Sequence, residues 1–84
     1  MAYNAVFTIQ FEKDVKSIKK DNLLLQRLEQ KIVEILNEPE HYKPLRNVLK
    51  GKRRAHVGSF VIIFEVIKEE VILYRFEHHD KVYK

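Results

Sequence analysis

The chain contains no cysteine, and it has only two glycines and two prolines among its 84 residues. Without cysteine there is no disulfide framework and no thiolate chemistry, which suits a reducing compartment, so we expect a cytoplasmic protein. No apolar run approaches the roughly 20 residues that a membrane-spanning helix needs. The first residues, Met1 to Asn4, do not show the charged and apolar segments of a signal peptide. We therefore expect no membrane association.

The composition supports one domain over residues 1–84, with 45% apolar residues available for a core. The formal net charge is +4 and is unevenly distributed. Residues 1–42 carry six Lys/Arg and seven Asp/Glu, whereas residues 43–84 carry ten and five. Between Lys43 and Arg54 there are six cations and no acid. Such a run is often a solvated loop. This one leads into a strand, which favours an anion-binding surface.

The N-terminal half predicts a strand and a helical hairpin. A strand is expected over residues 3–9, because the side chains at alternate positions form two sets, one for each face of a strand. A short helix follows, because the next apolar residues recur at i, i+4 and i+7: Phe11, Val15 and Ile18. A second helix is expected from about 23 to 37, after a cap at Asp21 or Asn22. It ends before Pro39, since the residue preceding a proline avoids the helical region.

The C-terminal half predicts three strands, over residues 53–57, 60–67 and 70–77. A two-residue turn at Gly58-Ser59 pairs Val57 with Phe60. Arg54 and His56 then lie on the face away from the helices, because strand side chains alternate.

The predicted fold is α+β, with an N-terminal strand, a two-helix hairpin and a three-stranded antiparallel meander. The helices pack on one face of a four-stranded sheet.

Three stretches carry motifs in a fixed order. The basic loop ends Leu49-Lys50-Gly51, the next strand reads Arg54-Ala55-His56-Val57-Gly58-Ser59-Phe60, and the chain closes with Glu77-His78-His79-Asp80-Lys81-Val82-Tyr83. This set resembles the RelE/ParE superfamily of type II toxins. The resemblance implies a RelE-like, microbial RNase-like fold and a cognate antitoxin, in a toxin–antitoxin heterotetramer. For the RelE branch it implies an mRNA endonuclease (mRNA interferase) that works on the ribosome and inhibits translation. For the ParE branch it implies inhibition of DNA gyrase.

The resemblance extends to single residues. Arg54 and Tyr83 match the first motif arginine and the terminal tyrosine. His56 and His79 stand where arginines are usual. Val61 replaces the arginine that helps to hold the scissile phosphate in RNase members. His56 and His79 therefore change the kind of chemistry that such a site offers.

Metal-free RNA cleavage needs a base for the 2′-hydroxyl, an acid for the 5′-oxygen and cations for the phosphorane. Histidine suits the first two roles because it titrates near neutral pH, and lysine and arginine suit the third. We assign catalysis to four residues: His79, His56, Arg54 and Tyr83. We expect the RNA phosphates to contact Lys50, Lys52, Arg53, Arg54 and His78. No metal and no other cofactor is expected.

Simpler interpretations stand beside these roles. His56 could pair with Glu65 on the surface, and Tyr83 could anchor the C-terminus. Arg75 could be an edge charge paired with Glu77 or Glu65. If the last strand continued through both adjacent histidines, only one of them would face the site.

Two other functions are open. A zinc site could use His56, His78, His79 and Asp80, but adjacent histidines rarely ligate one ion and no spacing matches a zinc pattern. A basic sheet could also bind nucleic acid or a protein without catalysis. Such a binding module would tolerate alanine at His56 and His79, whereas an RNase would not.

Overall fold

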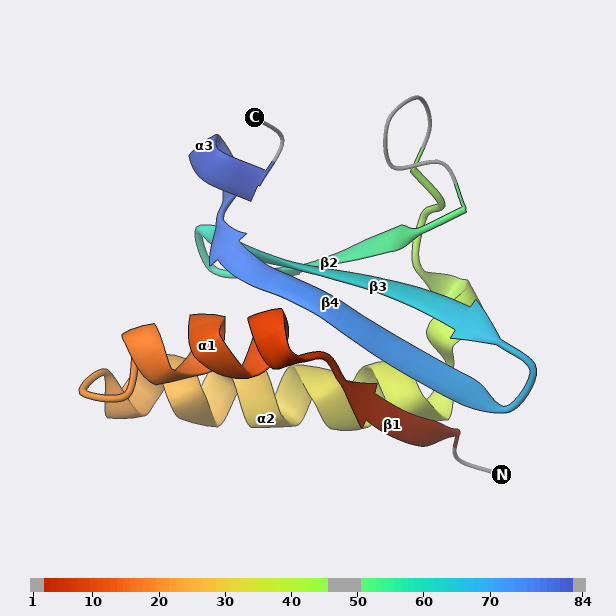
Figure 1. Cartoon of the computed structure of the whole chain (residues 1–84), viewed down its shortest axis with the longest axis horizontal. Helices are drawn as coiled ribbons and strands as arrows, with labels where there is room; N and C mark the ends of the chain where they lie inside the picture. The colour runs from red at the N-terminus through yellow and green to blue at the C-terminus, as the bar shows by residue number, and fades with distance from the viewer. Residues whose placement is uncertain (1–2, 46–50, 83–84) are drawn as a thin grey trace.

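The computed structural model describes residues 3–45 and 51–82 (Figure 1). Its elements are β1 (Asn4–Phe7), α1 (Ile9–Ser17), α2 (Asn22–Asn37), a 3-10 turn η1 (Pro39–His41), β2 (Arg53–Val57), β3 (Phe60–Ile67), β4 (Glu70–His78) and α3 (His79–Val82). The four strands and the helices α1 and α2 follow the predicted order, whereas η1 and α3 were not predicted. The sheet order is β1-β4-β3-β2, with β1 parallel to β4 and the other pairs antiparallel. The predicted α+β fold is confirmed. None of the described helices is long and apolar enough to cross a membrane.

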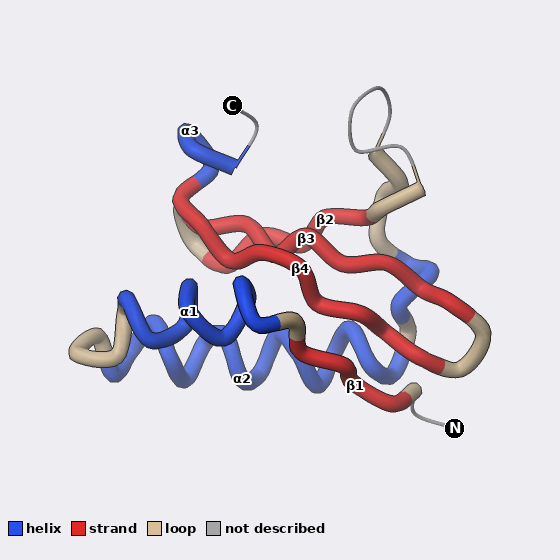
Figure 2. Tube along the Cα trace, viewed as in Figure 1, coloured by secondary structure: helices blue, strands red, loops and turns tan. Residues whose placement is uncertain are grey.

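The core lies between the sheet and the two long helices, which cover the same face (Figure 2). Its buried members come from both helices and from three strands: Phe11, Leu28, Ile35, Ala55, Val57, Ile62, Phe64, Val71, Leu73 and Phe76. The predicted register is confirmed, since Val57 pairs with Phe60 and His56 pairs with Val61. Each fully buried large apolar side chain stabilises the fold by roughly 1.5–3 kcal/mol.

The first strand is shorter than predicted, and the expectation of a strand over residues 3–9 is wrong at its end. Thr8 is the N-cap of α1, and its side-chain oxygen accepts a hydrogen bond from the Phe11 backbone N–H at 3.1 Å. Its backbone N–H donates to the Leu73 carbonyl at 3.2 Å. A threonine that satisfies a helix terminus in this way stops the strand and begins the helix. The same residue ties α1 to β4.

After the end of β1, the edge of β4 is covered by α1, and Asp14 of α1 makes the contact. Asp14 is buried, with only 7% of the residue exposed. Its carboxylate accepts hydrogen bonds from the Phe76 backbone N–H (2.9 Å), Arg75 Nε (2.9 Å) and Gln10 Nε2 (3.0 Å). A buried carboxylate is tolerated when it is paired and hydrogen-bonded in this way. Arg75 also forms an ion pair with Glu77, so two carboxylates share its charge.

A β-bulge determines on which face of the sheet the side chains of β4 lie. Ile63 pairs with Arg75 but Phe64 pairs with Leu73, so Tyr74 is an extra residue in β4. Leu73 and Phe76 both point into the core. By alternation on either side of the bulge, Tyr74, Arg75 and Glu77 lie on the opposite face. We call this side of the sheet, away from α1 and α2, the open face.

Candidate functional site

The centre of the open face is apolar and its borders are charged. His56 and Glu77 flank Val61 across the strands, and Arg54 and Arg75 flank Ile63. Val61 and Ile63 are 0% and 1% exposed. The borders are two strand spacings apart, about 10 Å. Charged side chains from β2 and β4 therefore face each other across a buried apolar strip.

The β2 border is a basic pocket. A hollow of about 430 Å³ is lined by Arg54, Ala55 and His56 of β2. The other lining residues come from α2, η1 and the segment that follows it: Lys31, His41, Tyr42 and Lys43. No acidic side chain is among these lining residues. Cations from separate segments raise the local positive potential, which attracts an anion. The pocket thus brings together two predicted site residues.

Sequence reasoning missed Lys31, His41 and Lys43 as members of this pocket. Lys31 lies on α2 and pairs with Glu34 at 3.5 Å, as an ordinary surface residue would. His41 lies at the end of η1 and contacts the Tyr42 ring edge-on at 5.5 Å. The available signal was the basic run from Lys43, but the contribution of α2 depends on tertiary packing.

The second part of the site is His79, at the start of α3. Its backbone N–H donates to the Ser59 carbonyl at 2.9 Å. Its ring Nδ1 lies 3.2 Å from the same carbonyl, and its Nε2 lies 3.0 Å from Asp80 Oδ1. Both ring nitrogens thus face oxygen acceptors, and only the imidazolium can donate to both. This geometry suits a general acid.

His78 lies beside His79, with the two rings stacked 4.7 Å apart. Strand alternation does not separate them, because β4 ends at His78 and the chain turns into α3. His78 Nδ1 accepts a hydrogen bond from the Asp80 backbone N–H at 3.2 Å. Asp80 therefore contacts both histidines.

The two predicted catalytic histidines lie on either side of the β2–β3 turn. His56 is on β2, and His79 packs on Ser59 of the turn itself. Both are exposed to solvent. Two further predicted residues, Tyr83 and Lys50, lie outside the described residues.

Lys52 and Arg53, adjacent in the sequence, have different surroundings. Lys52 Nζ lies 4.9 Å above the Tyr74 ring, on the open face. The Tyr74 hydroxyl donates to Glu65 Oε1 at 2.7 Å, and this hydrogen bond is the main cause of a raised pKa for Tyr74. Arg53 instead donates from Nη1 to the Tyr42 carbonyl at 2.7 Å. Its guanidinium joins β2 to the segment after η1, which is a structural role.

A metal ion would find three neighbouring donors at the C-terminal end. His78, His79 and Asp80 each offer one ligand atom, and these atoms lie within 4.8 Å of one another. Imidazole and carboxylate donors suit zinc and similar divalent ions. His56 is not part of this group, so the four-residue arrangement considered from the sequence is not formed among the described residues.

Comparison with known proteins identifies the family. A family model described as the ParE toxin of the type II toxin-antitoxin system, parDE, matches residues 5–83. The chain belongs to this family of toxins. It is 40% identical over 72 residues to RelE4 of Methanocaldococcus jannaschii, whose name places it among toxins; the match covers 82% of this chain and 77% of that protein. The predicted membership of the RelE/ParE superfamily is confirmed.

Solved structures of similar proteins have the same fold. YafQ from E. coli superposes with a TM-score of 0.81 at 24% identity, covering 98% of this chain and 99% of YafQ. A chain of the toxin-antitoxin complex RelBE2 from Mycobacterium tuberculosis also superposes with a TM-score of 0.81, at 23% identity, covering 94% of this chain and 100% of that chain. At these identities the likeness establishes the fold.

Proposed function

We propose that this toxin is a metal-independent endoribonuclease that cleaves mRNA on the ribosome and so inhibits translation. The observation that carries the proposal is the environment of His79. Its ring is held by Ser59 and Asp80 in a donating arrangement, at the end of the sheet where His56 lies in a basic pocket. A binding module would have no need of two histidines placed in this way around one turn.

In the proposed reaction, neutral His56 accepts the proton of the 2′-hydroxyl as that oxygen attacks the adjacent phosphorus. The bond from phosphorus to the 5′-oxygen breaks, and His79 gives this oxygen a proton. The products are a 2′,3′-cyclic phosphate and a 5′-hydroxyl. Arg54 and Lys52 stabilise the charge that develops on the phosphorane.

Ser59 and Asp80 have separate parts in this reaction. The Ser59 carbonyl accepts from Nδ1 of His79 and fixes the orientation of the ring. Asp80 is exposed, so a leaving oxygen can displace it from Nε2. The histidine therefore keeps one anchor while its other nitrogen donates the proton.

A cognate antitoxin is the proposed protein partner, because the related RelBE2 structure is a toxin-antitoxin complex. The half of this chain from residue 43 onwards carries ten basic and five acidic residues. An acidic or amphipathic antitoxin segment that covers the basic face or the helical hairpin would match this charge. An assembly of two toxins and two antitoxins is the proposed form.

The test uses purified ribosomes programmed with a defined mRNA. Wild-type protein should cut the mRNA in the A site, and His79→Ala should cut roughly 10²–10³ times more slowly, the usual cost of removing one catalytic donor. Lys68→Asn is the matched control, since Lys68 lies in the distant β3–β4 turn with a φ of 56° that asparagine tolerates. Equal rates for wild type and His79→Ala would refute the proposal.

A further inference from the structure

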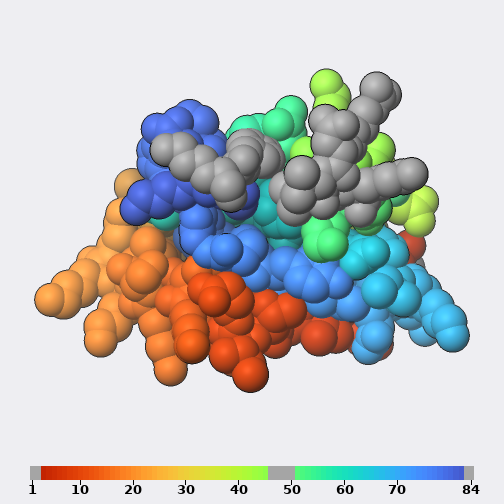
Figure 3. Space-filling model, turned by 45° about the horizontal axis from the view of Figure 1, so that its top comes forward, coloured from red at the N-terminus to blue at the C-terminus, as the bar shows by residue number. Residues whose placement is uncertain are grey.

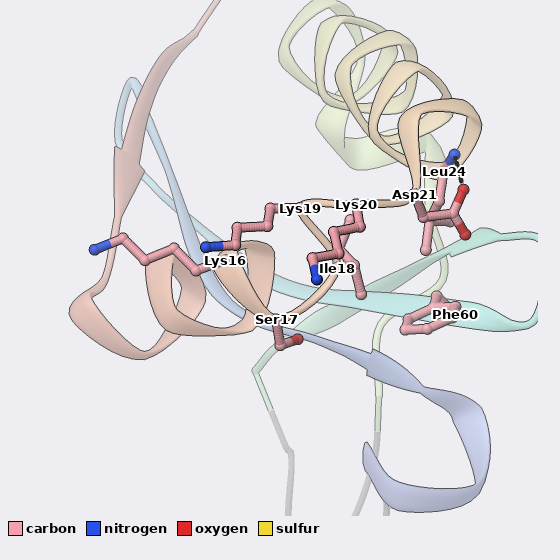
Figure 4. A pocket seen from close by; sticks show the side chains of 8 residues that line it. All are labelled: Lys16, Ser17, Ile18, Lys19, Lys20, Asp21, Leu24 and Phe60. Carbon is pink, nitrogen blue, oxygen red and sulfur yellow. Dashed lines mark hydrogen bonds between the residues drawn. The ribbon is translucent and has the colours of Figure 1, made fainter.

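A second hollow lies next to Phe60, between the α1–α2 turn and the start of β3. Its volume is about 470 Å³. Ile18, Leu24 and Phe60 supply its apolar surface, and their side chains converge on the same space (Figure 4). We call it the turn pocket. It shares no lining residue with the basic pocket.

The rim of the turn pocket is cationic. Lys16, Lys19 and Lys20 line it from the end of α1 and the turn. The acid among the lining residues, Asp21, already accepts a hydrogen bond from the Leu24 backbone N–H at 3.0 Å as the cap of α2. The pocket therefore combines an apolar floor containing an aromatic ring with an excess of positive charge. A nucleotide has the complementary combination, a flat base and an anionic phosphate.

A series of ring contacts connects the turn pocket to the proposed acid. The Phe60 ring contacts the His78 ring edge-on at 5.8 Å, and His78 stacks on His79 at 4.7 Å. Phe60 itself stacks on Phe76 at 5.0 Å, which fixes its position. Figure 3 shows the orange α1–α2 turn beside the blue C-terminal segment on the surface. An RNA strand whose phosphate lies at His79 therefore has the turn pocket within reach.

We infer that the turn pocket binds the base of a nucleotide flanking the cut, with Phe60 in contact with the base and the lysines near its phosphates. The inference rests on the proposed function, because it takes RNA as the ligand. The continuity with His79 favours RNA over an acidic peptide of the antitoxin.

The test measures binding of a non-cleavable 2′-O-methyl RNA oligonucleotide and of a set in which each position in turn is abasic. With wild-type protein, one position beside the cut should lose affinity by about 5- to 100-fold, the usual effect of one stacked base. In Phe60→Leu the loss at that position should disappear while the losses at other positions remain. A general folding defect would weaken all oligonucleotides alike, so the position-specific pattern distinguishes the two.

The lysines are tested by salt dependence. Changing Lys16, Lys19 and Lys20 together to glutamine should reduce the slope of log affinity against log salt by up to about 2, since each single-strand phosphate contact contributes about 0.7. Lys68→Asn should leave the slope and the abasic pattern unchanged.

The proposal is overturned if the wild-type abasic series is uniform, or if Phe60→Leu keeps the position-specific loss. It is also overturned if these variants bind RNA normally and bind the antitoxin more weakly, which would make the pocket a protein contact. If the wild type shows the position-specific loss but never cuts mRNA on ribosomes, the proposed function fails and the turn pocket stands as an RNA-binding site.

Discussion

Replacing Asp14 should destabilise the fold more than its place on a charged helix suggests. In Asp14→Ala the buried Phe76 N–H loses its acceptor, which costs about 1–3 kcal/mol. The lost ion pair adds no more than about 1 kcal/mol, because the Arg75 side chain is 38% exposed and keeps Glu77 as a partner. The free energy of unfolding should therefore fall by about 1–4 kcal/mol, from a total of roughly 4–13 kcal/mol for a domain of this length.

The assay is equilibrium urea unfolding followed by circular dichroism. With an m-value of about 1.5 kcal/mol per M, the midpoint should fall by about 0.7–2.7 M. Asp14→Asn keeps an acceptor for the Phe76 N–H and loses only the charge, so it should cost about 1 kcal/mol. Glu12→Gln, an exposed change on the same helix, is the control. A loss of unfolding free energy below about 0.5 kcal/mol in Asp14→Ala, the size typical of surface changes, would refute the conclusion that Asp14 stabilises the edge of β4.

Two further predictions concern the basic run and the open face. Arg53→Met should reduce stability by about 1 kcal/mol, since it removes the hydrogen bond to the Tyr42 carbonyl. This change should leave the salt dependence of RNA binding unchanged. Arg54→Met, by contrast, should lower the slope of log affinity against log salt by about 0.7. Tyr74→Phe should cost about 0.5–1.5 kcal/mol at pH 7 by removing the bond to Glu65. Because this bond raises the pKa of Tyr74 in the folded state, its contribution is present below the ordinary tyrosine value of 10.0 and is lost as pH rises through the higher folded value. Unfolding at pH 7 and above pH 10 measures both effects, and an equal cost of Tyr74→Phe at the two pH values would contradict this reasoning.

Local patterns in the sequence determined the hairpin well. The alternation on either side of Gly58-Ser59 predicted the bounds of β2 and β3 and their register, which the structure confirms. A two-residue turn fixes register directly, so no distant contact is needed. Gly58 has a φ of +61°, as such a turn requires.

Distant contacts were not predictable in the same way. Asp14 looks like any charged residue of an amphipathic helix, and its burial arises only when α1 packs on the edge of β4. The face of the sheet on which Arg75 lies depends on a β-bulge, which no local sequence pattern predicts. The basic pocket joins Lys31 of α2 to His56 of β2, which are far apart in the sequence. His79 was predicted as a site residue, but its anchoring on Ser59 required the turn from β4 into α3.

The most direct test of the central claim is mapping of mRNA cleavage in cells after induced expression, with wild type beside His79→Ala. The proposed function predicts cuts at discrete codon positions in the wild type and their loss in the variant, with the variant still folded and still bound by the antitoxin. Growth arrest with intact mRNA would contradict the claim and would indicate a toxin directed at gyrase or another protein target.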